Sequence, residues 1–290
     1  MPNPEQPAGR EAMALMQREM RVAFGPVGNV IDGTALRTGA WLLRGEEFLM
    51  HLETMSLRYR KGKGVTAELR EGTRQSELDL FLNGSVYAAA ACLNGLFPIH
   101  ASAVAHEGRV HAFTGPSGAG KSTLVTALGN RGLPMFCDDT LILDLSDPEV
   151  PLALPGHKRL KLTAEALALT GVSGGEQVHD EVPKFYADPP AGDCADPLPL
   201  HQLVFLDNAD CVLAEPITGA EKIARLSDDH YLAEIWEFAN QPDPAMRFAL
   251  HARLARQVRM ARLGRPRNLA LFDQTVTLAQ HLVCGHETGS

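Results

Sequence analysis

The sequence is poor in the features that mark secreted and membrane proteins. Its 290 residues include five cysteines and no C-x-x-C pair, so we expect neither a disulfide framework nor a zinc site. Residues 1–7 contain no basic or apolar signal-peptide region, and the longest mostly apolar run, residues 86–99, is too short to cross a bilayer. We therefore expect a cytoplasmic protein with no membrane partner.

Positive charge is also scarce. Lysine and arginine number 27 against 35 aspartates and glutamates, which gives a formal net charge of −8. A chain with this excess of negative charge is a poor general ligand for the phosphate backbone of DNA or RNA. Nucleic acid is therefore not an expected partner.

The most informative stretch matches the pattern G-x-x-x-x-G-K-[ST], the phosphate-binding P-loop. The residues that we expect to bind a nucleoside triphosphate are Gly115, Pro116, Ser117, Gly118, Ala119, Gly120, Lys121, Ser122 and Thr123. The glycines allow backbone N–H groups to turn toward the phosphates, and Lys121 is expected to reach the β- and γ-phosphates. The Ser122 hydroxyl is expected to bind Mg²⁺, so ATP and Mg²⁺ are the predicted cofactors.

The surroundings of the loop are those that a P-loop requires. Residues 109–113 are apolar and strand-like, and residues 121–131 carry an apolar helical face that ends at Gly132. The N-terminus of that helix would direct its partial positive charge at the phosphates. Pattern and context together predict a nucleotide-binding α/β protein.

Three chemically active side chains flank the loop. Asp138 and Asp139 follow an apolar strand over residues 133–137, and His100 begins the hairpin that leads into the loop. One carboxylate near a γ-phosphate can accept the proton of an attacking hydroxyl, and a second can serve Mg²⁺. The sequence contains no T-K-x-D or N-K-x-D element for guanine, which disfavours a GTPase.

Residues 100–139, and more loosely residues 79–290, resemble the HPr kinase/phosphorylase family of bacterial P-loop kinases. The shared order is a histidine at the spacing of His100, the P-loop, and an acid pair at the spacing of Asp138 and Asp139. The resemblance implies an α/β fold with a P-loop core like that of the HPr kinase C-terminal domain and of PEP carboxykinase. It implies that Asp138 is the general base, assisted by His100. It also implies that Lys121 holds phosphates and that Ser122 and Asp139 serve Mg²⁺.

The sequence also departs from this family. The segment E-[IV]-R-G-L-G is missing and residues 155–162 stand in its place, while the loop ends in Thr123 where HPr kinases usually have glutamate. The chain is therefore more similar to the HPr-kinase-like offshoot found beside peptide-modifying genes, which includes kinases of the C-terminal serine of lasso precursor peptides. HPr itself is then not the expected substrate.

The rest of the chain is divided at residue 78. Residues 1–78 read as a small β-rich N-terminal region with a flexible start, and residues 79–290 as the kinase domain. We expect a mobile loop over residues 171–199 and an arginine-rich helix over residues 244–263. Arg159 and Lys161 share one face of a predicted strand and could hold ATP phosphates or a peptide carboxylate.

Three hypotheses for function stay open at this point. The first is an ATP- and Mg²⁺-dependent kinase acting on a serine hydroxyl of a peptide or small protein, possible targets including the C-terminal serine of a ribosomal peptide precursor. The second is a small-molecule kinase acting on, for example, free serine or a sugar. The third is a nucleotide-dependent regulatory protein that holds a partner through the arginine-rich helix. A homo-oligomer is expected in each case.

Overall fold

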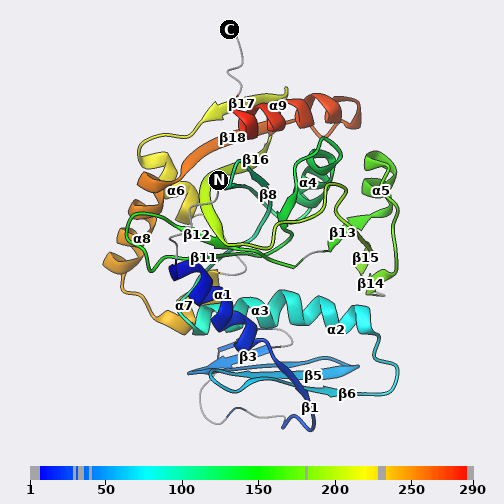
Figure 1. The fold of residues 1–290 in the computed structure, drawn as a ribbon, viewed down its shortest axis with the longest axis vertical. Coiled ribbons are helices and arrows are strands. Elements are labelled where there is room, and N and C mark those ends of the chain that lie inside the picture. The colour runs from blue at the N-terminus through cyan, green and yellow to red at the C-terminus, as the bar shows by residue number, and fades with distance from the viewer. Residues whose placement is uncertain are drawn as a thin grey trace.

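The computed structural model describes residues 7–28, 31, 36–38, 41–157, 159–179, 182–227 and 233–285. The strands in this part of the chain form three sheets, which together with the helices make a mixed α/β structure. Figure 1 shows the N-terminal sheet at one end of the molecule, with α2 and α3 lying between it and the larger sheet. The α/β class that the sequence predicts is therefore confirmed.

The N-terminal sheet has the order β1-β6-β5-β4-β3-β2. Its strands are β1 (Val22–Phe24), β2 (Leu36–Thr38), β3 (Trp41–Arg44), β4 (Glu47–His51), β5 (Met55–Arg60) and β6 (Gly64–Leu69). From β2 to β6 each strand pairs antiparallel with the next, as the short runs broken by glycine predict. In β5 the fully buried Leu57 and Tyr59 alternate with Arg58 and Arg60, so one face of the sheet is apolar.

A layer of helices covers that apolar face. It consists of α1 (Pro7–Glu19), α2 (Gln75–Phe81), the π-turn η1 (Leu82–Val86) and α3 (Tyr87–Leu93). The alanines 88–91 are fully buried, and their small side chains let α3 approach its neighbours closely. One continuous core joins Phe48 of the sheet to Ala90 of α3, so packing runs across the predicted boundary at residue 78. A separate domain over residues 1–78 stays a prediction.

The central sheet carries the P-loop. Its strands run in the order β10-β8-β9-β16-β12-β11-β7, and β18 and β17 extend it beside β16. Their bounds are β7 (Phe97–Ile99), β8 (Ala101–His106), β9 (Arg109–Thr114), β10 (Met135–Cys137), β11 (Leu141–Asp144), β12 (Leu152–Leu154), β16 (Leu198–Asn208), β17 (Leu213–Pro216) and β18 (Arg259–Arg265). The predicted lead-in strand and the following helix α4 (Lys121–Asn130) are both present.

The topology brings three distant parts of the chain to one edge of this sheet. Strand β8 pairs antiparallel with β9 and with β10, so β9 and β10 both end where β8 begins. His100 precedes β8, Gly115 follows β9 and Asp138 follows β10. Antiparallel pairing alone therefore gathers the histidine, the P-loop and the acid pair.

A third, small sheet corrects one prediction. The predicted mobile loop over residues 171–199 contains two strands, β14 (Gln177–His179) and β15 (Val182–Ala187), and β15 pairs with β14 and with β13 (Leu160–Thr163). The register places Lys161 opposite Tyr186 and Thr163 opposite Lys184, so these four side chains share a face. The helix α5 (Ala164–Thr170) follows β13 as predicted, with the Thr163 side chain accepting a hydrogen bond from the Ala166 N–H.

A second prediction is also wrong. The arginine-rich helix does not extend over residues 244–263: α8 (Pro244–Gln257) ends early, and β18 runs parallel to β16 along seven residue pairs. Leu254, Val258 and Ala261 fit a helical spacing, but β16 offers a long buried strand whose backbone groups need a partner. Sheet pairing therefore overrides the helical pattern.

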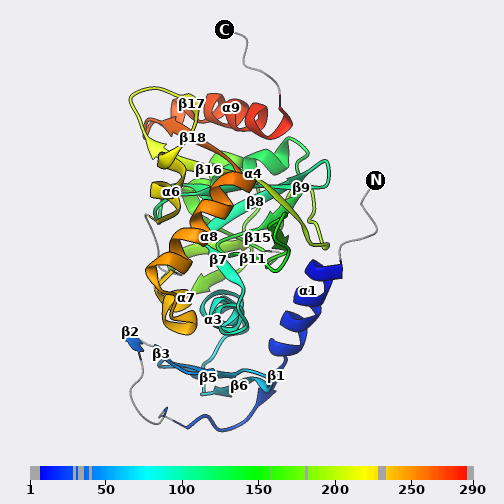
Figure 2. The same ribbon diagram turned by 90° about the vertical axis from the view of Figure 1, so that its left-hand side faces the viewer.

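Helices cover both faces of the central sheet. Figure 2 shows α6 (Ala220–Ser227), α7 (Ala233–Asn240) and α8 on one side. The other face packs against α4 and α9 (Phe272–Cys284), which follows the short η2 (Leu269–Leu271). None of the helices in the described ranges combines the length and the apolar character needed to cross a membrane.

Candidate active site

The P-loop has the backbone shape that binds phosphate. Gly118 and Gly120 adopt φ angles of 79° and 81°, in the left-handed region that glycine tolerates best. A Cβ atom at Gly120 would lie 2.9 Å from the Arg265 guanidinium, and one at Gly115 would lie 3.0 Å from the Leu206 carbonyl oxygen. Side chains are therefore excluded from these positions by conformation and by close packing.

The loop lysine is folded back onto its own loop. Lys121 is 6% exposed, and its Nζ donates hydrogen bonds to the carbonyl oxygens of Gly115 and Pro116 at 2.8 and 3.2 Å. Burial lowers the pKa of Lys121, while the nearby Asp139 and Asp138 oppose that change. Its ammonium group is thus held by neutral acceptors at the place where phosphates bind in a P-loop.

Asp138 is the buried member of the acid pair. It is 4% exposed, and its Oδ1 accepts hydrogen bonds from the hydroxyls of Ser102 and Ser122 at 2.6 and 2.7 Å. Its Oδ2 accepts the main-chain N–H of Lys161 at 3.2 Å. These three donors fix the carboxylate beside the first turn of α4.

Asp139 is the open member of the pair. Its side chain is 40% exposed, and its φ of 73° turns it away from Asp138 and toward the cavity in front of the loop. The Lys161 ammonium lies 2.6 Å from its Oδ2, and His100 Nδ1 lies 3.5 Å from its Oδ1. Burial alone would raise the pKa of Asp139, but the paired Lys161 ammonium lowers that pKa to about 2, so the group is a carboxylate near neutral pH.

His100 is bound to the same residue. Its Nδ1 lies 2.9 Å from the main-chain oxygen of Asp139, and its own carbonyl oxygen accepts the Thr114 hydroxyl at 3.0 Å. Burial and the neighbouring Lys121 lower the pKa of His100 below its usual value, partly offset by Asp139. A neutral imidazole therefore stands between the end of β9 and the acid pair.

These contacts pair the residues differently from the sequence-based prediction. The prediction joins His100 to Asp138 and Ser122 to Asp139, whereas the structure brings His100 to Asp139 and Ser122 to Asp138. The sequence could not distinguish the two arrangements, because the left-handed backbone at Asp139 decides which carboxylate faces which neighbour.

The loop, His100 and Asp139 line a cavity of about 320 Å³, which we call the phosphate cavity because the P-loop lines it. Three further cationic residues line it, namely Lys161, Lys184 and Arg265. Arg265, at the end of β18, donates a hydrogen bond to the Ala119 carbonyl oxygen of the loop. The sequence alone does not indicate that Lys184 and Arg265 lie here, and it predicts a helix over residues 259–263 of β18, the strand that carries Arg265.

Arg159 lies apart from these cations. Its guanidinium stacks on the Tyr186 ring, 4.0 Å from the centroid, and pairs with Glu176 at 3.2 Å and Asp79 at 3.9 Å. It is not among the residues that line the phosphate cavity. Its predicted role in ATP binding stays a prediction, and Lys161, two residues further on, lines the cavity.

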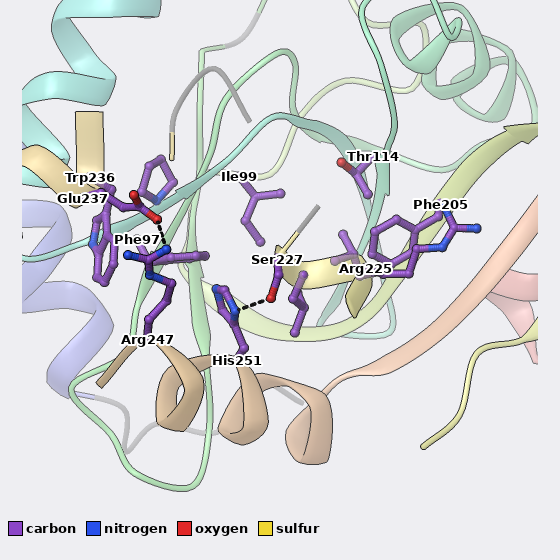
Figure 3. A pocket seen from close by; sticks show the side chains of 13 residues that line it. Phe97, Ile99, Thr114, Phe205, Arg225, Ser227, Trp236, Glu237, Arg247 and His251 are labelled. Atoms are coloured by element: carbon purple, nitrogen blue, oxygen red, sulfur yellow. Dashed lines mark hydrogen bonds and ion pairs between the residues drawn. The ribbon is translucent and has the colours of Figure 1, made fainter. Parts of the chain in front are cut away.

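A second, smaller cavity of about 90 Å³ lies on the other side of the strand ends, between the central sheet and α6, α7 and α8 (Figure 3). Its walls are mostly apolar, and its polar side chains bind one another. Glu237 pairs with Arg247 at 3.1 Å, and Ser227 Oγ lies 2.9 Å from His251 Nδ1. Asp138, Asp139 and the loop residues 115–123 are not among the residues that line it.

The residues beside the P-loop suit Mg²⁺. This ion prefers oxygen ligands and is usually held by one or two carboxylates together with substrate phosphates. Ser122 Oγ and Asp138 Oδ1 lie 2.7 Å apart at the start of α4, which supplies a hydroxyl and a carboxylate. Within the described residues no group of three or more His, Cys, Asp or Glu side chains could hold a metal, so the remaining ligands would come from phosphate and water.

Comparison with known proteins gives a structural similarity but no family. No family model matches the chain, and no curated protein matches it. Among solved structures, the chain is similar to the Hpr(Ser) kinase/phosphatase from Coxiella burnetii, with 14% sequence identity and a TM-score of 0.32 over 65% of this chain and 99% of that one. At that score the similarity assigns no residue roles, and the roles below rest on the geometry.

Proposed function

We propose that the protein is an ATP- and Mg²⁺-dependent kinase that transfers the γ-phosphate to a serine hydroxyl of a peptide or small protein. One observation carries the proposal: the carboxylate of Asp139 opens into the P-loop cavity between His100 and Lys161. A carboxylate in this position can accept the proton of an attacking hydroxyl. A protein that only binds nucleotide has no need of it.

The two carboxylates take different roles in this proposal. Asp138, bonded to Ser122, is the ligand for Mg²⁺, which when bound neutralises charge on the β- and γ-phosphates. Asp139 is the general base. As the serine oxygen attacks phosphorus, the bond from the γ-phosphorus to ADP breaks and the hydroxyl proton passes to the Asp139 carboxylate. These roles are the reverse of those that the resemblance to HPr kinases implies.

Lys161 supports both acids at once. Its main-chain N–H donates a hydrogen bond to Asp138 and its ammonium binds Asp139. One residue of β13 therefore holds both carboxylates in place. Burial alone would lower the pKa of Lys161, but the two carboxylates raise it above its ordinary value and keep it cationic. The ammonium also lines the cavity, where it can stabilise the transferring phosphoryl group.

The hypothesis of a regulatory protein depends on one arginine-rich helix over residues 244–263, and α8 ends at Gln257. Of the five arginines within the predicted helix over residues 244–263, Arg259 and Arg262 lie on β18. Several bind within the chain: Arg253 donates to the carbonyl oxygens of Leu145 and Asp147, and Arg262 pairs with Asp207 and Glu215. The arginines of residues 244–263 are therefore divided between α8 and β18 and do not share one helical face. The small-molecule kinase stays open as the second candidate.

A transfer assay with γ-labelled ATP and Mg²⁺ tests the proposal, with serine-containing peptides, including serine-ended ones, and free serine as acceptors. We expect label on a peptide serine. The Asp139→Asn variant should lose transfer by about a hundred- to ten-thousandfold while its affinity for ATP stays unchanged. Asparagine tolerates the left-handed backbone of this position, so the variant should fold.

Asp138→Asn is the matched variant. It should lose the dependence of ATP affinity on Mg²⁺, measured by calorimetry with and without the ion, because the metal's carboxylate ligand is gone. If Asp138→Asn keeps that dependence while Asp139→Asn keeps full transfer, the assignment of roles is wrong. Label on free serine and on no peptide would replace the peptide acceptor by a small molecule.

A further inference from the structure

The phosphate cavity has two chemically different ends. The end at the acid pair is lined by His100, Lys121, Asp139, Lys161 and Lys184. The rest of the lining includes five hydrocarbon side chains from two separate segments of the chain. These are Leu162, Ala166 and Leu169 from β13 and α5, and Leu269 and Phe272 from η2 and α9.

These two apolar groups flank the start of α4. Both α5 and α9 pack beside α4, and Figure 1 shows them on different sides of it. Lys121 to Thr123 at the first turn of α4 line the cavity between them. A ligand anchored by its phosphates at the loop would therefore reach apolar surface on either side.

Leu269 gives independent support, because its exposed side chain lies at this cavity. It is 56% exposed, and only four other large hydrophobic side chains of the described residues are exposed, namely Phe24, Leu69, Met246 and Phe248. Of these five, Leu269 lines the phosphate cavity. Exposed apolar side chains at the edge of a polar cavity are typical of ligand contacts.

We propose that Leu269 and Phe272, together with the half-buried Leu169 on the other side of the first turn of α4, form the nucleobase subsite of this cavity. The proposal rests on the proposed function only in taking a nucleoside triphosphate as the ligand. The apolar side chains contact the two faces of the base, and the Phe272 ring stacks on it. Burial of Leu269 by the base then removes the exposed leucine from water.

The composition of the subsite also sets its selectivity. Hydrocarbon side chains contact the faces of a base, and stacking is tolerant of base identity because every base has a π-face. Glu165 is the acidic side chain in this part of the lining. Its carboxylate can accept a hydrogen bond from the C6 amino group of adenine or, with the base turned in the subsite, from the C2 amino group of guanine. ATP and GTP should therefore bind with affinities within about tenfold of each other.

Calorimetry with ATP, GTP and inorganic triphosphate tests the subsite. Phe272→Ser should weaken ATP and GTP by about tenfold each, the lower part of the range for one stacked base, and leave triphosphate unchanged. Leu269→Ser should weaken both nucleotides by a few-fold. Since Leu269 is exposed, this variant should fold even if Phe272→Ser, whose ring packs against the core beneath α4, does not.

Matched controls come from exposed residues elsewhere. Phe248→Ser on α8 and Leu69→Ser on β6 make the same chemical changes outside the cavity and should bind all three ligands like the parent protein. Unchanged ATP affinity in Leu269→Ser and Phe272→Ser, or an equal loss for triphosphate, would overturn the subsite. A preference of more than a hundredfold for ATP over GTP would overturn its low selectivity. Binding is measured without an acceptor, so a failure of phosphate transfer would leave these results intact.

Discussion

The cations that contact the P-loop are held differently from those of the smaller cavity. In the smaller cavity, Arg247 pairs with Glu237 (Figure 3), and Arg225 pairs with Asp207. In the phosphate cavity, the two cations that contact the P-loop, Lys121 and Arg265, are held by carbonyl oxygens of the loop, whereas Lys161 pairs with Asp139. A cation that leaves a neutral carbonyl for a phosphate leaves no buried charge behind, whereas one that leaves a carboxylate does.

That difference separates a ligand site from a structural one, although adjacent residues build both. Thr114 lines the smaller cavity and the P-loop starts at the next residue, while Ile99 lines the smaller cavity and His100 lines the larger one. Alternation along the strands sends neighbours to opposite sides. Position in the sequence therefore does not tell the two apart, but the partners of their cations do.

The largest expected effect in this comparison tests whether a cation held by carbonyl oxygens, rather than by a carboxylate, is one that binds phosphate. Lys121→Met removes a cation held by carbonyls and should slow transfer by at least about a hundredfold, because the phosphates lose their main side-chain donor. Arg247→Met removes a cation held by a carboxylate and should leave transfer within about threefold. Initial rates at saturating ATP check both variants. Equal losses in the two variants would break the distinction between the cavities.

A second test measures how much the packing around the smaller cavity contributes to the free energy of unfolding. Phe205 is 6% exposed and lines that cavity, so Phe205→Ala should lower the free energy of unfolding by about 3 kcal/mol. Urea unfolding measures the change, and ATP affinity should stay at the parental value. Phe248→Ala, at an exposed phenylalanine, should change stability by less than about 0.5 kcal/mol. A loss of ATP affinity in Phe205→Ala would show that the smaller cavity takes part in nucleotide binding.

The sequence predicted the local part of this architecture well. The P-loop, the strand before it and the helix after it depend on residues close in sequence, and their bounds are nearly those expected. Antiparallel pairing of β8 with its neighbours then brings His100 and the acid pair to the loop, as the hairpin pattern indicates.

The parts that the sequence did not predict depend on distant partners. β18 has an apolar spacing that a helix also satisfies, and only its place beside β16 makes it a strand. Arg265 reaches the P-loop from that strand, so it was missed together with it. The position of Lys184 follows from the register of β15 against β13, and β15 forms in a stretch rich in glycine, proline and aspartate.

The smallest expected effect lies at the opposite end of β9 from the P-loop. His111 is 3% exposed, its Nδ1 lies 3.1 Å from Gln202 Oε1, and its ring faces the rings of His201 and His106. Burial lowers the pKa of His111 to about 4, with His201, His106 and Arg109 adding to the effect and Gln202 opposing it. Its charged form is therefore disfavoured only in the folded protein.

The sign of the pH effect follows from this shift. Between pH 6.5 and 4 the unfolded chain binds a proton at this histidine that the folded chain does not, so acid stabilises the unfolded state. From pH 6.5 to pH 5 this one group should lower the free energy of unfolding by about 1.5 kcal/mol. His111→Gln should remove that part of the pH dependence, measured by urea unfolding at a series of pH values. A variant that keeps the parental slope would show that the acid sensitivity comes from other groups. An altered transfer rate in folded His111→Gln at pH 7 would show that this end of β9 is coupled to the phosphate cavity.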